Sequence, residues 1–220
     1  MAASPSAVSS LTLNRLSIYL RALRHLAEEG VDTISSQRLA ARLDLSAAQI
    51  RKDLTYFGEF GVRGVGYSVT DLTARLSHLL GLDRTHPIIV VGTGNLGSAL
   101  AHFLNFADRS FRVVAAVDND PRKIGRKVGE VTIESSSRLA TVVRRSGAQI
   151  GVLTVPRKAA QNNYDQLVRA GIKAVLNFAP IRLVSSADIP TKSVDLRVFL
   201  EELGFHLFQG ENGRPGASAR

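Results

Sequence analysis

The chain has 220 residues, of which 45% are hydrophobic, and a formal net charge of +9 at pH 7. This length accommodates one ordinary domain and a smaller one. No apolar run approaches the roughly 18 residues that a membrane span requires, and the N-terminus lacks a signal-peptide pattern. The absence of cysteine excludes disulfides and thiolate metal sites. We expect a cytoplasmic protein with no membrane partner.

The positive charge is unevenly distributed along the chain. Residues 1–83 have 9 Lys and Arg against 8 Asp and Glu, residues 84–188 have 15 against 7, and residues 189–220 have 4 against 4. A basic chain is typical of nucleic-acid binding. Because the excess lies outside the first 83 residues, the bulk charge alone does not locate a DNA site.

The first 83 residues carry a helix-turn-helix pattern. Apolar residues recur at helical spacing over residues 16–27, and Ser35 and Ser46 are each suitable N-caps for a short following helix. Two short helices joined by a tight turn are typical of DNA-binding proteins. The helix predicted over 47–56 has an apolar face and an opposite face of amide, cationic and hydroxyl groups. Such groups can pair with base edges and phosphates, although an ordinary solvated surface has similar composition.

Glycines then punctuate two β-prone runs over residues 58–69, which predicts a small hairpin with Arg63 and Gly64 at its tip. An arginine on a glycine-bordered tip can enter a narrow minor groove. Helix-turn-helix plus β-wing makes a winged helix, which favours DNA binding over a purely structural role. The predicted DNA-binding residues are Ser46, Gln49, Arg51, Lys52, Tyr56, Arg63 and Gly64. A further helix, capped by Thr70, completes the domain predicted over 1–83.

An apolar run at residues 88–91 leads into a glycine-rich turn and then into helix-forming sequence. The turn has the Gly-x-Gly-x-x-Gly spacing that holds a dinucleotide pyrophosphate at a helix N-terminus. The residues predicted to contact the cofactor here are Gly92, Thr93, Gly94, Asn95, Leu96 and Gly97.

The next predicted strand, over residues 111–117, ends at Asp118, about 20 residues past the last glycine. A carboxylate at that strand end can accept hydrogen bonds from ribose hydroxyls, which favours NAD(H) as the cofactor. A plain turn residue is the alternative interpretation of Asp118. Arg122 and Lys123 lie close by, so the strictness of selection against NADP stays open.

Two later strands, near residues 150 and 174, each end in a polar residue followed by a proline loop. Ligands of open α/β sheets bind at the carboxyl ends of strands, so these loops are candidates for the nicotinamide side of the pocket. Their residues are Thr154, Val155, Pro156, Asn177, Phe178, Ala179 and Pro180. We therefore predict an α/β fold with a Rossmann-type NAD(H)-binding domain over 84–193, a C-terminal helix over 194–209 and a disordered tail over 210–220.

An NAD-dependent oxidoreductase needs a substrate domain and a proton-transferring group beside the nicotinamide. The chain leaves little room for such a domain, has no Tyr-x-x-x-Lys pair, and its five histidines form no metal-spaced cluster. The sequence thus favours binding without catalysis and predicts no catalytic or metal-ligating residue. An oxidoreductase with an N-terminal regulatory domain and a regulator that binds CoA or another nucleotide are the alternatives.

Five motifs in this order resemble the Rex family of redox-sensing transcriptional repressors, and the resemblance covers nearly the whole chain. They are AQIRKDLTYFG at residues 48–58, RGVGY at 63–67, GTGNLG at 92–97, TVP at 154–156 and NFAP at 177–180. The resemblance implies a homodimer that binds an inverted-repeat operator with NAD+ or without ligand and is released by NADH. It also implies that the C-terminal helix is swapped between subunits.

The resemblance further implies a switch between domains. In the family, an Asp of a Val-Asp-Leu stretch joins an Arg of the first helix and a Tyr near the nicotinamide, and these positions match Asp195, Arg21 and Phe103. Phe103 has no hydroxyl, so the chain departs from the family pattern there. A pair of Asp195 and Arg21 remains as the expected link.

Overall fold

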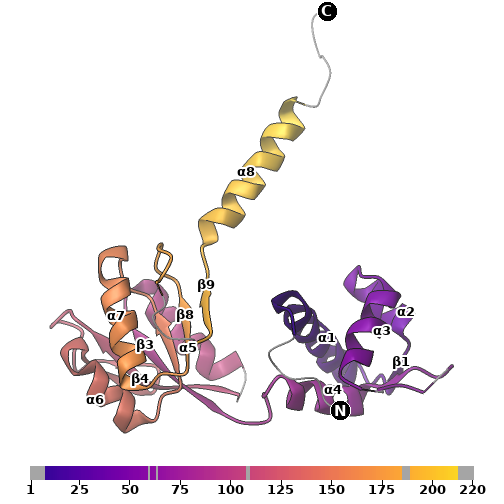
Figure 1. The fold of residues 1–220 in the computed structure, drawn as a ribbon, viewed down its shortest axis with the longest axis horizontal. Helices are drawn as coiled ribbons and strands as arrows, with labels where there is room; N and C mark the ends of the chain where they lie inside the picture. Colours follow the sequence, from indigo (N-terminus) through magenta and orange to yellow (C-terminus); the bar gives the residue numbers. More distant parts are fainter. Residues whose placement is uncertain (1–7, 59, 63, 108–109, 185–188, 213–220) are drawn as a thin grey trace, which may run out of the picture. The chain divides into compact units, whose positions relative to one another are not determined.

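The computed structural model describes residues 8–58, 60–62, 64–107, 110–184 and 189–212. The chain divides into an N-terminal unit, Met1–Arg84, and a C-terminal unit, Thr85–Arg220 (Figure 1). The division falls one residue beyond the boundary expected from the sequence. The predicted succession of a helix-turn-helix unit and a parallel α/β sheet is confirmed.

The N-terminal unit begins with a long helix and continues through two short ones. Its elements are α1 (Ser10–Glu28), β1 (Thr33–Ile34), α2 (Ser36–Leu43), α3 (Ala47–Tyr56), β2 (Tyr67–Ser68) and α4 (Val69–Leu79). Ser35 and Ser46 cap α2 and α3 as predicted, because each hydroxyl accepts a hydrogen bond from the backbone N–H three residues further along the chain. Thr70 was the wrong cap for α4: Ser68 caps that helix by accepting from Asp71 N.

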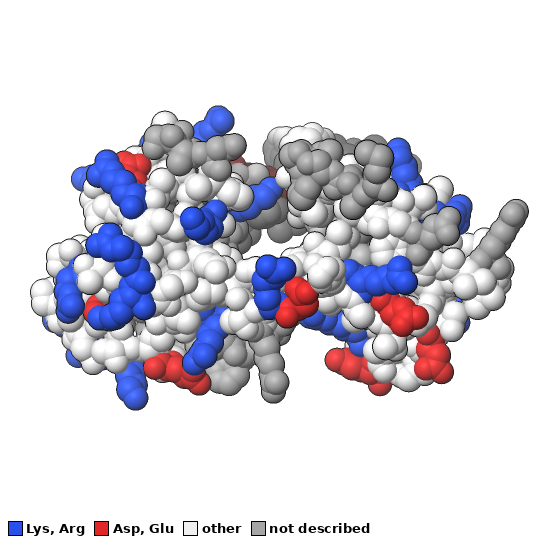
Figure 2. Space-filling view, turned by 60° about the horizontal axis from the view of Figure 1, so that its bottom comes forward, with Lys and Arg blue, Asp and Glu red and all other residues white. Residues whose placement is uncertain are grey.

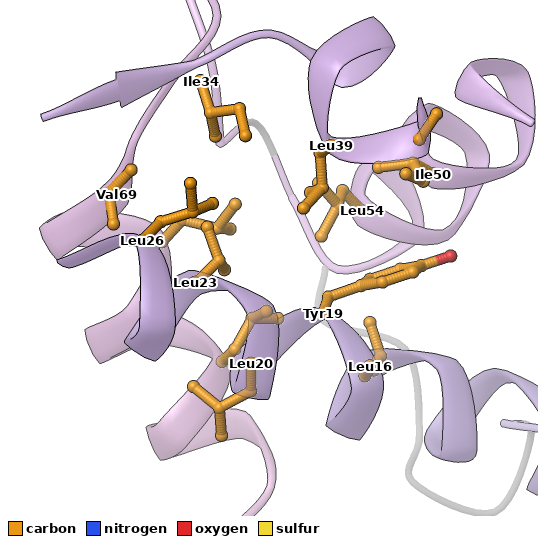
Figure 3. Close-up of a cluster of buried hydrophobic side chains, with 13 residues drawn as sticks. Leu16, Tyr19, Leu20, Leu23, Leu26, Ile34, Leu39, Ile50, Leu54 and Val69 are labelled. Carbon is orange, nitrogen blue, oxygen red and sulfur yellow. The ribbon is translucent and has the colours of Figure 1, made fainter. Parts of the chain in front are cut away.

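A single apolar cluster holds this unit together. Leucines of α1 pack against Leu72 and Leu76 of α4 on one side and against Ile50 and Leu54 of α3 on the other. Figure 3 shows the ring of Tyr19 lying among these side chains. The exposed side of α3 is thereby set by the helical spacing of its buried residues.

The chain reversal predicted for the wing agrees with an antiparallel bridge between Val62 and Gly66, but β2 finds its strand partner outside the wing. β2 pairs antiparallel with β1, which precedes α2, and the wing itself has one bridge, between Val62 and Gly66. Gly66 has φ +111, and a Cβ there would lie 2.6 Å from the carbonyl oxygen of Ile34. The glycine therefore lets the wing approach β1 closely. Arg63 lies outside the described residues.

The C-terminal unit is built on a sheet with strand order β5-β6-β4-β3-β7-β8-β9, parallel except for the β5–β6 pair. The strands are β3 (His86–Val91), β4 (Phe111–Asp118), β5 (Lys127–Val128), β6 (Val131–Ser135), β7 (Ile150–Leu153), β8 (Ala174–Asn177) and β9 (Thr191–Ser193). The helices are α5 (Asn95–Ala107), η2 (Ser136–Arg138), α6 (Leu139–Ser146), α7 (Arg157–Ala170) and α8 (Leu196–Asn212).

Helices cover both faces of this sheet. Ala101 of α5 belongs to one apolar cluster, whereas Val142 of α6 and Leu167 of α7 belong to another. The central strands are β-branched and apolar because both of their faces are buried. This doubly wound arrangement brings the ends of β3, β4, β7 and β8 to one edge of the sheet, where ligands of such folds bind.

The last helix, α8, differs from the others because its apolar side chains are exposed. Leu196, Phe199, Leu200 and Leu203 are each about 60% exposed. The helix begins two residues later than the predicted start at 194 and extends beyond residue 209 to Asn212. Residues 213–220, the rest of the predicted disordered tail, lie outside the described residues. None of the described helices is both long enough and apolar enough to cross a membrane.

Candidate functional site

The outward face of α3 carries most of the residues predicted to contact DNA. Arg51, Lys52 and Tyr56 are exposed, and Gln49 is half-buried at the edge of that face. Arg51 donates to the hydroxyl of Ser36 at the start of α2 (2.9 Å), which leaves its other guanidinium nitrogens available. Amide, guanidinium, ammonium and phenol groups on one exposed helix face can meet both base edges and phosphates.

Behind this face lies an ion pair that the sequence reasoning missed. Asp53 of α3 is 4% exposed and receives two hydrogen bonds from Arg15 of α1, from Nε at 2.6 Å and from Nη2 at 2.8 Å. The hydroxyl of Tyr19 donates to the same carboxylate at 2.8 Å, and so does Nε2 of Gln49 at 2.8 Å. One sign of this cluster is present in the sequence: the acidic residue Asp53 lies on the helix face of the apolar residues Ile50 and Leu54.

The electrostatics of this cluster follow from its contacts. Burial raises the pKa of Asp53, but the hydrogen bonds from Arg15, Tyr19 and Gln49 outweigh burial and lower the pKa below its ordinary value. Burial and the neighbouring carboxylate raise the pKa of the Tyr19 phenol. Asp53 is therefore an ionised acceptor that ties α3 to α1.

At the wing, the chain reverses direction between Val62 and Gly66. Gly66 N and Val65 N both donate to the Val62 carbonyl, and Gly64 is exposed with φ +83. Because no protein atom lies within 4 Å of a Cβ built on Gly64, its backbone is open to a ligand. The predicted contacts of Arg63 and Gly64 with DNA stay a prediction.

In the C-terminal unit, the three glycines of the turn differ in how closely an added Cβ would approach other atoms. Gly92 has φ +91, and its Cβ would lie 2.8 Å from the Thr154 carbonyl oxygen. A Cβ on Gly97 would collide with the Gly92 carbonyl oxygen and lie 2.6 Å from Thr154 Oγ1. These two glycines serve the packing of the turn against β7.

Gly94 is the exception, because a Cβ there meets nothing within 4 Å and its φ is not in the left-handed region. The protein itself gives no reason for a glycine at this place. A side chain would instead occupy the space that a pyrophosphate needs to reach the backbone at the start of α5. The turn therefore fits a dinucleotide, with Asn95 and Leu96 exposed on the first turn of the helix.

Asp118 lies against the same turn. Its Oδ2 accepts from Thr93 N at 2.7 Å, from Thr93 Oγ1 at 2.8 Å and from Lys123 Nζ at 3.1 Å, while Oδ1 accepts from Asp120 N at 2.9 Å. Burial raises its pKa, but these hydrogen bonds outweigh burial and hold the pKa at about 2. The carboxylate thus fixes the glycine-rich turn to the end of β4. Oδ1 retains capacity for a further donor.

The two loops predicted at the nicotinamide side are shaped by internal hydrogen bonds. Thr154 Oγ1 donates to the Gly92 carbonyl at 2.6 Å. Asn177 is fully buried, donates to the carbonyl oxygens of Ala179 and Ile181, and accepts from Ala179 N. The polar atoms of both residues hold the loops in place. Of the neighbouring apolar residues, Pro156 and Pro180 are exposed, whereas Val155 and Phe178 are half-buried and pack against the core of the sheet.

A cavity of about 550 Å³ opens beside the second loop. It joins part of the predicted cofactor site to the predicted switch residue, since Ala179, Pro180 and Asp195 all line it together with Arg157 and Arg182. Asp195 itself is exposed and accepts from Arg197 N at 3.0 Å at the start of α8.

The other two predicted switch residues lie on helix surfaces. Arg21 is exposed on α1 in the N-terminal unit, and Phe103 is 63% exposed on α5 in the C-terminal unit. A phenylalanine this exposed is available to a ligand or to another protein surface. The expected link between Arg21 and Asp195 stays a prediction.

The surface of the C-terminal unit shows the excess of positive charge that was counted along its sequence. Figure 2 shows more Lys and Arg than Asp and Glu on the visible face of the C-terminal unit. Several cations of this unit are paired with acids, such as Arg145 with Glu134 and Arg122 with Asp120. Among the described residues there is no cluster of His, Asp and Glu that could hold a metal ion.

Comparison with known proteins covers both units. Residues 7–55 match the family described as the N-terminus of putative DNA-binding proteins, and residues 83–181 match the family described as a CoA binding domain. The redox-sensing transcriptional repressor Rex of Syntrophomonas wolfei is 49% identical over 91% of this chain and 95% of its own length. Its counterpart in Desulforamulus reducens is 46% identical with the same coverage.

Two solved structures of a repressor called RSP match nearly the whole chain. The complex of RSP with beta-NAD+ and operator DNA has a TM-score of 0.87 and 36% identity, and covers 95% of this chain and 99% of that chain. The complex with beta-NADH has a TM-score of 0.84 and 36% identity, and covers 93% and 96%.

Proposed function

The chain belongs to the Rex family of redox-sensing transcriptional repressors, and we propose that it represses transcription by binding operator DNA until NADH releases it. Gly94 is the observation that carries the sensing half of this function. Nothing in the fold requires a glycine at that position, whereas a bound pyrophosphate does. The exposed face of α3 supplies the DNA-binding half.

The residues around the turn account for NAD(H) recognition. Backbone N–H groups at the start of α5 face the pyrophosphate, and Asp118 Oδ1, which accepts one hydrogen bond from Asp120 N, has a lone pair left for a ribose hydroxyl. The exposed Pro156 and Pro180 and the accessible parts of the half-buried Val155 and Phe178 offer apolar contact to the nicotinamide. Because burying an unpaired charge is costly, apolar walls favour the neutral dihydronicotinamide over the cationic ring of NAD+.

We propose that the protein acts as a homodimer formed through α8. A helix with eight large apolar side chains between 57% and 71% exposed needs a partner surface. Those residues are Leu196, Val198, Phe199, Leu200, Leu203, Phe205, Leu207 and Phe208. A two-fold dimer presents two copies of α3, which matches an inverted repeat. Such a protein acts on the chromosome, which supports a cytoplasmic location.

The switch is then a two-state equilibrium of the dimer. One state favours operator DNA and the other favours NADH, so each ligand weakens the other by the same factor. Arg21 and Asp195 belong to different units. A pair between them would form in one state of the dimer and break in the other. Phe103 replaces a hydroxyl-bearing residue of the family pattern and leaves that pair without a third member.

The relatives are repressors by name, which supports the assignment of no catalytic activity to the chain. The match of residues 83–181 to a CoA binding domain keeps CoA as a ligand to be compared with NAD(H).

A gel-shift titration tests these assignments together. An operator is first selected with the unliganded protein from randomised duplexes, and then challenged with NAD+, NADH, NADPH and CoA at equal concentrations. We expect release by NADH alone. Release by CoA alone would instead make the chain a CoA-responsive regulator, and steady oxidation of NADH would make it an oxidoreductase.

A further inference from the structure

Asp53 accepts a hydrogen bond from its own helix in addition to those from α1. Three hydrogen bonds from Arg15 and Tyr19 already satisfy this buried carboxylate. Gln49, one turn earlier on α3, adds a fourth through Nε2 at 2.8 Å. Gln49 is half-buried and lies at the edge of the face proposed to meet DNA.

The bond to Asp53 decides which way the Gln49 amide faces. An ionised carboxylate can only accept hydrogen bonds, so the NH2 group and not the carbonyl oxygen of Gln49 must face it. The amide nitrogen carries two hydrogens. One donates to Asp53, and the other remains next to Oε1, so a donor and an acceptor stay side by side for a ligand.

A donor beside an acceptor is the pattern that recognises adenine. In the major groove adenine offers N7 as an acceptor and N6–H as a donor, whereas guanine offers two acceptors, N7 and O6. A glutamine pairs with both adenine groups only while its amide keeps one orientation. A freely rotating amide would lose part of that preference because it could present its groups in the opposite order.

This reasoning rests on the proposed DNA-binding role of α3. We propose that Asp53, itself held by Arg15 and Tyr19, is a positioning residue that orients the Gln49 amide to read an adenine in the operator. Asp53 does not touch the DNA. It acts through Gln49, and the ion pair with α1 keeps the carboxylate in place.

Three variants distinguish a change in the orientation of the Gln49 amide from a loss of folding. Gln49→Met removes the reader but leaves Asp53 its three other donors. Asp53→Asn keeps Gln49 but offers it an NH2 group, which would turn the amide around. Lys52→Ala is the matched control, since it removes an exposed cation from the same helix but leaves the hydrogen bond between Gln49 and Asp53 intact.

The measurement is the operator affinity of each protein for duplexes in which every half-site base pair is replaced in turn. We expect the wild-type protein to prefer adenine at one position by about 10-fold or more, from a bidentate contact. Gln49→Met and Asp53→Asn should abolish that preference at this position and keep the others. Lys52→Ala should keep the adenine preference at this position. Retention of the adenine preference by folded Asp53→Asn would overturn the proposal.

A second arm tests the direction of the Gln49 amide without altering Asp53, whose replacement can unfold the protein by disturbing a buried ion pair. The adenine at the discriminating position is replaced by 7-deazaadenine, which lacks the N7 acceptor. We expect the wild-type protein to lose affinity and Gln49→Met to lose none. Equal losses, or no loss in the wild type, would overturn the proposal, whereas failure of the wild type to bind any selected duplex would overturn the DNA-binding function itself.

Discussion

Each unit holds a buried aspartate beside the surface proposed to bind its ligand, and the two are anchored differently. Asp53, in the N-terminal unit, is held by side chains from α1 and α3. Asp118, in the C-terminal unit, accepts backbone N–H groups from Thr93 and Asp120 in addition to side chains. One carboxylate therefore fixes the position of side chains, and the other fixes the path of the main chain.

This difference agrees with what each surface has to recognise. DNA sequence is read by side chains on base edges, so their orientation matters most. A pyrophosphate is bound by backbone N–H groups, so the path of the loop matters most. The following experiments break one unit at a time, from the largest expected effect to the smallest.

Gly94→Asp should reduce NADH affinity by more than about 100-fold, or roughly 3 kcal/mol, because it puts bulk and negative charge where the pyrophosphate approaches. A Cβ at Gly94 meets no protein atom within 4 Å, so the melting temperature should not change. Isothermal titration with NADH and a thermal melt measure both quantities.

The matched control is Gly97→Ala, whose methyl group would collide with Gly92 and Thr154. It should lower the melting temperature. A Gly94→Asp protein that binds NADH as tightly as the wild type would show that the open space at Gly94 is unrelated to the ligand.

Arg63→Ala should weaken operator binding by roughly 10- to 100-fold, the usual worth of one arginine contact to a base. NADH affinity should be unchanged, since residue 63 belongs to the other unit. Gel shifts on the selected operator measure the first effect and calorimetry the second. Equal operator affinities of the two proteins would remove Arg63 from the interface.

Asp118→Ala should destabilise the C-terminal unit by about 2 kcal/mol near neutral pH, given a folded pKa of about 2 against an ordinary value of 3.8. The folded state lowers this pKa, so the stabilisation is present above about pH 4 and is lost as the pH falls through about 2. Urea unfolding of both proteins between pH 7 and pH 2 measures whether the stability difference between them shrinks as the pH falls.

The variant should also respond less to NADH, because the turn loses its tether and the ribose loses an acceptor. A stability difference that does not shrink on acidification would contradict the hydrogen bonding of Asp118. An unchanged NADH release curve would contradict its contact with the ribose.

Arg21→Ala should have the smallest effect, a loss of coupling of about 5-fold, with little change in the affinity for either ligand alone. The readout is the ratio of operator affinities with and without saturating NADH. Arg24→Ala, on the same helix, is the control. A ratio equal to that of the wild type would exclude Arg21 from the switch.

The sequence predicted the features that depend on neighbours along the chain. The caps Ser35 and Ser46 and the Gly-x-Gly-x-x-Gly turn follow local rules of spacing and side-chain chemistry. Ser68 was missed as the cap of α4 because Thr70, two residues further on, is also a suitable N-cap residue. The strand at Thr33–Ile34 was missed because two residues show no periodicity.

Features that depend on tertiary contacts could not be predicted in this way. Asp53 is four residues from Gln49 but 38 from Arg15, and only the packing of α1 on α3 brings that pair together. The difference between Gly94 and Gly97 depends on the folded path of the turn, which brings the Gly92 carbonyl against Gly97, and on Thr154, more than 50 residues further along the chain. The proposed pair of Arg21 and Asp195 involves both units and stays a prediction, because local rules of the sequence do not address it.

The central claim is that one chain couples its two units so that NADH and operator DNA exclude each other. The most direct measurement is a linkage experiment on the wild-type protein, with operator affinity at zero and saturating NADH, and NADH affinity with and without operator. The two factors should both exceed about 5 and be equal. An operator affinity that saturating NADH leaves unchanged would contradict the account.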